Sequence, residues 1–302
     1  MDKGMKINGV HIDDTFAEAF PMKVVRLIIT AHNMDWAYNA ANAATGFATS
    51  VIACGCEAGI ERELKPKETP DGRPGIAILL FTMGGKDMTK QIQNRVGQCV
   101  LTCPTSACFA GMDDGEKVPL GKNLRFFGDG WQISKRFGGQ RYWRVPVMDG
   151  EFLCQESAWM NKGIGGGNFL VLAETQAQAL AACEKAIKAM RKVPEVIMPF
   201  PGGVVRSGSK VGSQYKSLPA STNDAYCPTL KGQVKSNLGP EIGSVMEIVI
   251  DGVTEAAIKE ATRVGVEAAC SLGRKRGIHR ISAGNYGGNL GPFHFKLREI
   301  CR

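Results

Sequence analysis

Apolar residues recur along the chain in strand-like and helix-like patterns, and the same order of patterns occurs twice. In the first half, short and largely apolar runs predict strands at residues 24–30, 49–53, 76–82 and 124–127. Helical spacing follows the first run, from Asn33 as N-cap through Asn42, and follows the third run over residues 86–102. The predicted order is strand, helix, strand, strand, helix, strand.

The second half repeats this order. Its predicted strands are residues 169–173, 196–198, 245–250 and 279–283, and its helices run from Thr175 to Met190 and from Thr254 to about Gly273. Two copies of βαββαβ predict an α+β fold with two ferredoxin-like lobes, each an antiparallel sheet with helices on one face. We place the lobes at residues 1–148 and 149–302, with residues 1–20 as an amphipathic lead-in.

Residues 199–244 interrupt this regularity between two predicted strands of the second lobe. They show no strand or helix period and are longer than connections in compact domains usually are. The segment is rich in donors and cations, including Arg206, Ser207, Ser209, Lys210, Ser213, Tyr215, Lys216, Ser221, Thr222, Asn223, Asp224 and Tyr226. We interpret it as a binding surface held by two strands. A solvated loop without a ligand is the alternative.

One carboxylate stands inside the apolar strand that follows this loop. Glu247 lies in the sequence VMEIVI (residues 245–250), and strand alternation places it on one face with Val245 and Val249. Such a glutamate either faces solvent or is partly buried with a raised pKa. The neighbouring loop favours the second alternative, in which Glu247 serves as a general acid or base near neutral pH.

Two glycine-rich stretches, residues 163–167 and 284–288, are expected to be turns beside the two sheets. Neither lies between a strand and a helix, so neither matches a dinucleotide fingerprint, and residues 207–210 lack the spacing of a P-loop. Close backbone packing or a ligand-facing turn is the remaining explanation for the glycines of both stretches. The chain also lacks a G-x-S-x-G elbow, an H-E-x-x-H motif and a Ser-His-Asp order.

Composition limits the other classes of function. The ten cysteines and four histidines of the 302-residue chain lack paired metal-ligand spacings, so we expect reduced thiols and no structural zinc. No run of 18 apolar residues exists, and the N-terminus lacks the apolar centre of a signal peptide. We therefore expect a cytoplasmic protein that makes no membrane contact.

The formal charge of +8 divides into +3 for residues 1–148 and +5 for residues 149–302. Its densest cluster is Arg274, Lys275 and Arg276 with Arg280, directly after a predicted helix, where cations interact favourably with the helix dipole. A polyanion-binding module is the alternative, but no aromatic residues interleave the cluster. Nucleic acid is therefore not an expected partner.

Several longer motifs resemble one family over nearly the whole chain. They include INGV (residues 7–10), ATGFATSVI (44–52), TPDGRPG (69–75), PFPGG (199–203), PASTNDAYCP (219–228), EIVI (247–250) and ISAGNYGG (281–288), with residues 14–20, 57–60 and 95–99. These runs are similar to those of formylmethanofuran:tetrahydromethanopterin formyltransferases. The resemblance implies two ferredoxin-like lobes assembled into a homotetramer, which agrees with the fold predicted from the periodicity.

The resemblance also implies the chemistry. A formyl group would move between the amine of methanofuran and a ring nitrogen of tetrahydromethanopterin, both carrier substrates, with no metal or prosthetic group. Glu247 matches the family's proposed catalytic glutamate, and the tetrahedral oxyanion would require oriented donors. We expect the substrates to be bound by Asp14, Thr45, Gly46, Asp71, Arg73, Pro201, Gly202, Gly203, Ser207, Ser209, Lys210, Ser221, Thr222, Asn223, Asp224 and Tyr226.

The positive charge departs from the strongly acidic pattern of many archaeal members of this family. It favours a bacterial member in a methylotroph, where the chain would be the transferase subunit of a formyltransferase/hydrolase complex that carries formaldehyde oxidation to formate. A basic surface would attract the glutamyl units of methanofuran. The alternative function is a non-catalytic subunit that binds a pterin or serves as a scaffold for a one-carbon enzyme complex.

Overall fold

A computed structural model describes residues 4–302, so the first three residues of the expected lead-in lie outside it. The chain divides into two compact units. Unit 1 comprises the described residues up to Pro21 together with Ile164–Arg302, and unit 2 comprises Met22–Gly163. These units differ from the expected contiguous lobes, 1–148 and 149–302, because the N-terminal residues pair with strands from the C-terminal part of the chain.

Unit 2 contains a four-stranded antiparallel core. Its order is β4 (Glu57–Leu64), β5 (Gly75–Thr82), β3 (Phe16–Thr30) and β6 (Ala107–Ala110). The helices α1 (Met34–Thr45) and α3 (Gly85–Arg95), the latter continued by a π-helical turn at Val96–Val100, bury alanine, methionine, isoleucine and valine side chains against the sheet. Asn33 caps α1 as predicted, because its side chain accepts the backbone N–H of Trp36.

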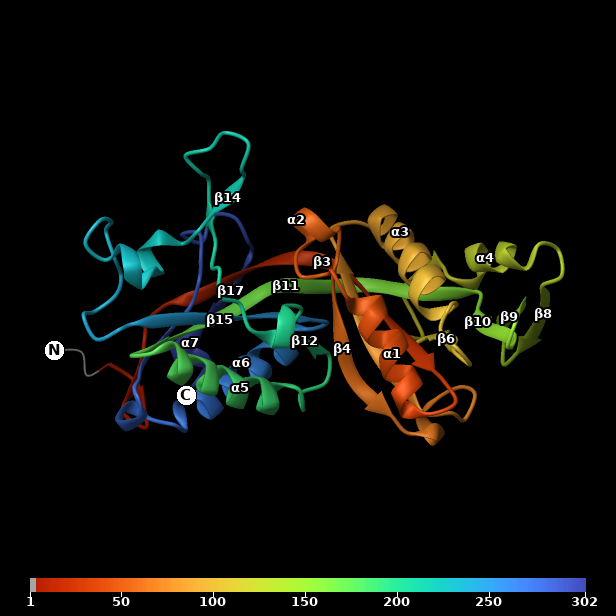
Figure 1. The fold of residues 1–302 in the computed structure, drawn as a ribbon, viewed down its shortest axis with the longest axis horizontal. Coiled ribbons are helices and arrows are strands. Elements are labelled where there is room, and N and C mark those ends of the chain that lie inside the picture. The colour runs from red at the N-terminus through yellow and green to blue at the C-terminus, as the bar shows by residue number, and fades with distance from the viewer. Residues whose placement is uncertain (1–3) are drawn as a thin grey trace. The chain divides into compact units, whose positions relative to one another are not determined.

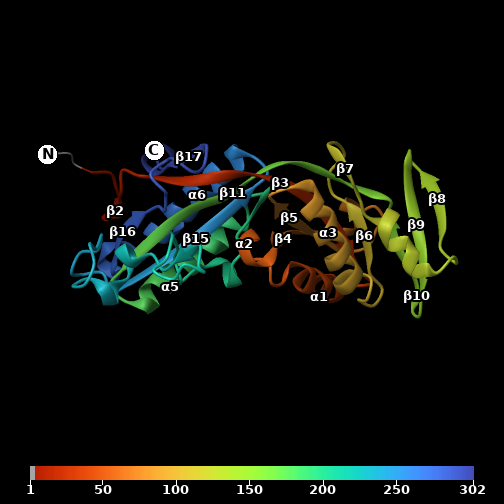
Figure 2. The same ribbon diagram turned by 90° about the horizontal axis from the view of Figure 1, so that it is seen from above.

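An antiparallel meander that the sequence pattern did not reveal extends this sheet. It consists of β8 (Ile133–Phe137), β9 (Gln140–Val147) and β10 (Gly150–Gln155), and β10 pairs in parallel with β6 (Figure 2). The remaining elements of unit 2 are α2 (Val51–Cys54), a 3₁₀ turn at Pro66–Glu68, β7 (Glu116–Pro119), α4 (Gly121–Leu124) and a 3₁₀ turn at Arg125–Gly128. β7 pairs with the start of β11 (Ser157–Ala173).

Two of the predicted strands in unit 2 are wrong. Residues 49–53 contain the short helix α2, which Ser50 caps and which Gly55 ends in a left-handed conformation, so the second strand is β4 instead. Residues 124–127 belong to helical turns, and the fourth strand is β6. Both runs are short and largely apolar, and such runs occur in turns of helix as well as in strands.

Unit 1 repeats the arrangement with β12 (Val196–Ile197), β15 (Ser244–Gly252), β11 and β16 (Ile278–Ser282) in that order, all antiparallel. The helices α5 (Gln176–Met190) and α6 (Glu255–Cys270) cover one face (Figure 1), and threonine side chains cap both at the predicted positions. β2 (Val10–Ile12) adds in parallel to β16 and carries β1 (Lys6–Ile7). β17 (Phe293–Lys296) pairs with β3 and leads into α7 (Leu297–Ile300).

The glycine stretch at residues 163–167 lies inside β11, so the turn predicted there is wrong. Its glycines serve close packing, the other possibility that the sequence leaves open. A Cβ atom on Gly167 would lie 2.8 Å from Cγ2 of Ile258, so only glycine lets α6 rest on the strand at this point.

The described residues also bear on the metal and membrane predictions. All ten cysteines are free thiols, and six of them are buried. Residues 4–302 contain no group of three or more His, Cys, Asp or Glu side chains arranged to hold a metal ion. None of the helices in the same range is long and apolar enough to span a membrane.

Candidate functional site

Strand β15 has two different faces. Met246, Ile248 and Ile250 are buried in the core beneath α5 and α6, whereas Val245, Glu247 and Val249 are half-buried on the opposite face. This is the alternation that the sequence predicts for Glu247. The strand therefore presents one carboxylate on the face of the sheet opposite α5 and α6.

The long loop covers this second face. It contains 3₁₀ turns at Pro201–Gly203, Asp224–Tyr226 and Pro228–Leu230, and a small hairpin of β13 (Lys210–Val211) and β14 (Ala220–Ser221). Figure 1 shows β14 and the segment after it on the side of β15 opposite α5 and α6, whereas the first turn of the loop, at Gly203, packs against Ile187 of α5. Val205 bridges Glu247 through two backbone hydrogen bonds of 2.8 and 2.9 Å, and Tyr226 packs on Leu170 and Leu172. The loop is thus joined to the strand at the backbone of Glu247.

A cavity of about 330 Å³ lies between the loop and the sheet. Its lining comes from β11, β15, the long loop and the segment after β16. The lining residues are Asn168, Leu170, Val205, Arg206, Ser207, Gly208, Ser209, Thr222, Asn223, Tyr226, Cys227, Pro228, Thr229, Val245, Met246, Glu247, Gly284, Asn285 and Tyr286. Hydroxyl, amide and guanidinium groups therefore surround a single carboxylate.

Burial raises the pKa of Glu247 to about 7. Its carboxylate makes no hydrogen bond or ion pair with any of residues 4–302, so nothing offsets the loss of hydration. A glutamate in this state holds or releases a proton near neutral pH, which is the property that general acid–base catalysis requires.

Tyr286 lies beside this carboxylate. Burial raises the pKa of its phenol and the charge of Glu247 raises it further, although a hydrogen bond with Ser209 acts in the opposite direction. The phenol therefore keeps its proton at neutral pH and remains a hydrogen-bond donor at the cavity wall.

The segment that carries Tyr286 is fixed at its start by Asn168. The Oδ1 atom of Asn168 accepts the backbone N–H of Gly284 at 2.6 Å, and its Nδ2 atom donates to the carbonyl of the same glycine at 3.1 Å. The predicted turn at residues 284–288 is thus present, and its first three residues line the cavity.

Six of the residues predicted from the sequence meet in this cavity: Ser207, Ser209, Thr222, Asn223, Tyr226 and Glu247. Three others line a second hollow of about 600 Å³: Lys210 and Ser221 of the adjoining hairpin, and Asp224 of the 3₁₀ turn that follows it. Nζ of Lys210 pairs with Oδ2 of Asp224 at 2.7 Å, and Oγ of Ser221 donates to the carbonyl of Gly212. Their side chains thus stabilise the hairpin and do not line the first cavity.

The remaining predicted residues do not line either hollow. Pro201, Gly202 and Gly203 form the 3₁₀ turn at the start of the loop. Asp14 is exposed, with Oδ2 3.5 Å from Nη1 of Arg298.

Thr45 and Gly46 lie at the end of α1 in unit 2. Oγ1 of Thr45 donates to the carbonyl of Ala41 at 2.8 Å, and Arg95 donates to the carbonyl of Gly46 at 2.7 Å. Both contacts complete the end of the helix.

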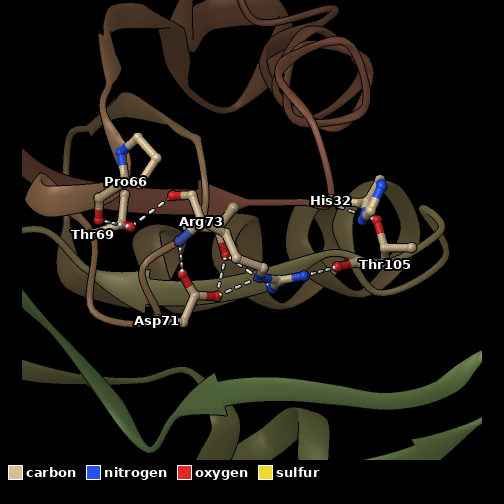
Figure 3. Close-up of polar contacts among 7 residues, drawn as sticks. His32, Pro66, Thr69, Asp71, Arg73 and Thr105 are labelled. Carbon is tan, nitrogen blue, oxygen red and sulfur yellow. Dashed lines mark hydrogen bonds and ion pairs between the residues drawn. The ribbon is translucent and has the colours of Figure 1, made fainter.

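Asp71 and Arg73 belong to a closed polar network in unit 2 (Figure 3). Nε of Arg73 donates to Oδ2 of Asp71 at 2.8 Å, and Thr30 donates to the same oxygen at 2.7 Å. Arg73 also donates to Oγ1 of Thr30 and to the carbonyl of Thr105. Each of these groups has a partner within unit 2, so the network ties the turn after β4 to β3.

Sequence reasoning missed part of the cavity wall, notably Asn168, Arg206, Cys227, Asn285 and Tyr286. The sequence identifies Arg206 only as one of the loop's cations, and it leaves the glycine-rich stretch after β16 open between backbone packing and a ligand-facing turn. That stretch is the signal that could have located Tyr286. Asn168 has no signal, because the pattern predicts that its strand begins at Phe169.

The basic cluster after α6 is partly neutralised within the chain. Arg274–Arg276 form a 3₁₀ turn. Nε of Arg280 lies 3.3 Å from Oδ2 of Asp13, and Nη2 donates to the carbonyl of Asn237. These contacts give Arg280 a structural role, whereas Arg274, Lys275 and Arg276 are exposed, so the absence of a nucleic-acid partner stays a prediction.

A half-buried carboxylate with a raised pKa, set in a polar cavity of a mixed helix and sheet protein, is typical of an enzyme that moves protons. Comparison with known families identifies the class. A model described as formylmethanofuran-tetrahydromethanopterin formyltransferase matches residues 5–147, and one described as FTR, proximal lobe, matches residues 150–300. The chain therefore belongs to the formylmethanofuran–tetrahydromethanopterin formyltransferase family, as its motifs suggested.

Individual relatives match nearly the full length of the chain. The formyltransferase of Methylococcus capsulatus is 73% identical over 98% of this chain and 99% of its own. A protein of Methylorubrum extorquens that is named as a subunit of the formyltransferase/hydrolase complex is 52% identical, over 97% of this chain and 96% of its own.

Solved structures give the same result. The Methylorubrum extorquens complex with methylofuran contains a chain that superposes with a TM-score of 0.96 at 51% identity, and the coverage is 99% of each chain. The formyltransferase of Methanosarcina barkeri superposes with a TM-score of 0.93 at 45% identity, over 98% of this chain and 100% of its own.

Proposed function

We propose that this chain transfers a formyl group between methanofuran and tetrahydromethanopterin. Its high-identity relatives bear the name of this activity, and they match this chain over nearly their whole length. Glu247 is the single observation that carries the proposal, because a carboxylate without a partner in a polar cavity fits a proton shuttle and serves no evident stabilising purpose.

The reaction requires one proton transfer to Glu247 and one proton transfer from it. The ring nitrogen of tetrahydromethanopterin attacks the formyl carbon of formyl-methanofuran, and the carbonyl oxygen becomes an oxyanion. Glu247 accepts the proton released by the attacking nitrogen. The bond from carbon to the methanofuran nitrogen then breaks, the carbonyl re-forms, and the same proton goes to the departing amine. A pKa of about 7 suits Glu247 to both roles.

The two carriers bind mainly in the cavity around Glu247. Ser207, Ser209, Thr222, Asn223 and Tyr226 supply hydroxyl and amide donors around Glu247, and such donors stabilise a developing oxyanion. Lys210 and Ser221 of the hairpin and Asp224 of the following turn line the adjoining hollow and would meet the outer part of a carrier. Roles in binding for Asp14, Thr45, Gly46, Asp71, Arg73 and Pro201 to Gly203 remain predictions from the family resemblance.

The finer fold assignment is part of the same proposal. In both units a βαββαβ order forms an antiparallel sheet in which the first strand lies between the third and the fourth, and the third lies beside the second. This is the arrangement expected of two ferredoxin-like lobes. The mechanism as written needs no metal or prosthetic group, and a cytoplasmic location stays a prediction.

The assembly is proposed from the relatives. The Methylorubrum extorquens relative is named as a subunit of a formyltransferase/hydrolase complex. We propose the same kind of complex for this chain, in which the formyl group goes on to formate. A homotetramer is the alternative, and light scattering of the chain alone and after co-expression with the hydrolase subunits distinguishes the two.

The direct test is formyl transfer by the purified chain, followed through the pterin absorbance with formyl-methanofuran and tetrahydromethanopterin. We expect transfer without added metal and with a chelator present. Glu247→Gln should lower kcat by about 10²- to 10⁴-fold, the usual contribution of general acid–base catalysis. Retention of activity within a few-fold would exclude the shuttle.

A matched control is available just before the strand. Glu241 is exposed, so Glu241→Gln removes the same charge outside the cavity. It should transfer formyl groups at the wild-type rate. An equal loss in both variants would indicate that net charge, and not the buried carboxylate, controls the reaction.

A further inference from the structure

Glu18 is a fully buried carboxylate of unit 1 that the mechanism does not use. It lies on β3 opposite His294 of β17 and is only 1% exposed. It does not line the cavity. A charged side chain this deeply buried requires strong compensation.

The compensation comes entirely from one segment. The backbone N–H groups of Tyr286 and Gly288 donate to Oε2 of Glu18 at 2.7 and 2.8 Å, and those of Leu290 and Gly291 donate to Oε1 at 2.6 and 2.7 Å. Each carboxylate oxygen thus accepts two hydrogen bonds, and the Glu18 side chain fixes the path of residues 286–291. Burial alone would raise the pKa of Glu18, but these four bonds lower it to about 2.

This segment is also pressed closely against β3. A Cβ atom on Gly291 would lie 2.3 Å from the carbonyl oxygen of Ala19, so no side chain fits at that position. The ring of Tyr286 lies 6.0 Å from that of Phe20. The carboxylate therefore holds the segment in a place with little freedom.

We propose, on the basis of the proposed function, that Glu18 is a positioning residue: its four hydrogen bonds fix residues 286–291 and so hold Tyr286 in the cavity wall beside Glu247. Asn168 fixes the preceding glycine, so the segment is held on both sides of Asn285. Glu18 acts on the reaction through this segment, because it does not line the cavity itself.

The consequence concerns the hydration of Glu247. The titratable or charged groups that line the cavity with it are Arg206, Tyr226, Cys227 and Tyr286. If the segment moves away, the wall on the Tyr286 side opens and water reaches the carboxylate. The pKa of Glu247 should then fall from about 7 toward its ordinary value.

Glu18→Gln is the appropriate variant, because it keeps the shape and replaces one acceptor oxygen by an NH₂ group that faces two N–H donors. We expect faster hydrogen exchange of the amides of residues 286–291. Carbon-13 NMR of labelled glutamate, assigned with Glu247→Gln, should show the Glu247 titration about one pH unit lower. In the formyl-transfer assay kcat should fall about tenfold, a modest loss of positioning, and the acid limb should move to lower pH.

Glu61→Gln is the matched control. Glu61 is also buried, and accepts two hydrogen bonds of 2.6 and 2.7 Å from Arg26 in unit 2. It should lower stability but leave the Glu247 titration and the exchange of residues 286–291 unchanged. If Glu18→Gln does not fold, Asn168→Ser releases the start of the segment and is examined in the same way.

Two results would overturn the proposal: an unchanged Glu247 titration in a folded Glu18→Gln protein, or an equal shift in Glu61→Gln. Neither readout depends on catalysis. An active Glu247→Gln enzyme would contradict the proton shuttle alone, and the NMR titration and the amide exchange would still decide the role of Glu18.

Discussion

The two units share one topology but use it differently, and their third strands show this most clearly. β5 in unit 2 is buried along its whole length, from Gly75 to Thr82. β15 in unit 1 alternates, and its outer face carries Glu247. The connection before β5 is residues 65–74, whereas the one before β15 is residues 198–243. The same scaffold has therefore been given a site by a long loop and one polar position.

The carboxylates associated with these connections differ in the same way. Asp71 accepts hydrogen bonds from Thr30 and Arg73 and stabilises its turn (Figure 3). Glu247 has no such partner among the described residues, and burial raises its pKa to about 7. One carboxylate contributes to stability, and the other reduces stability in return for reactivity.

The largest effect should appear when the charge of Glu247 is removed and stability is measured against pH. Its folded pKa lies above the unfolded value of 4.5, so wild-type stability should fall as pH rises from about 4.5 to 7. Above pH 7, Glu247→Gln should be more stable than wild type by on the order of 3 kcal/mol. Urea unfolding at pH 4 and pH 8 measures the difference. A variant less stable at pH 8 would mean that Glu247 has a stabilising partner.

The predictions from sequence were most successful where the period was long and the caps were clear. α1, α5 and α6 begin after Asn33, Thr175 and Thr254 as predicted, since a side-chain oxygen that satisfies a helix N-terminus is a local signal. The alternation of apolar and polar residues in β15 is a local signal too, and it placed Glu247 on the correct face.

The features that the sequence could not predict depend on distant contacts. Residues 124–127 are as apolar as a strand, yet Phe126 and Phe127 are exposed in a helical turn. Glu18 is an ordinary glutamate in the sequence, and its importance arises from a segment near the other end of the chain. No local pattern indicates which backbone groups will meet a buried carboxylate.

Removing Arg73 from the network around Asp71 should lower stability, by less than Glu247→Gln raises it above pH 7. In Arg73→Ala, Asp71, Thr30 and the carbonyl of Thr105 lose their hydrogen bonds with the guanidinium. The free energy of unfolding should fall by about 1–3 kcal/mol. The acid limb of the formyl-transfer profile should keep its wild-type position, because Glu247 is untouched. Thermal unfolding and the pH profile test both points. An unchanged melting temperature with a raised KM would instead assign Arg73 to substrate binding.

The smallest effect is expected at the hairpin of the long loop. A hydrogen bond from Lys210 lowers the pKa of Asp224, but the side chains of Lys210 and Asp224 are 44% and 33% exposed, so solvent screens the pair. Asp224→Asn should therefore leave the melting temperature unchanged within error, and any effect should appear in KM and weaken with added salt. A large loss of stability would show that the hairpin is part of the structural core of unit 1. A large loss of kcat at unchanged KM would show that the hairpin acts on the reacting atoms, and the functional part of the loop would then extend beyond the residues that surround Glu247.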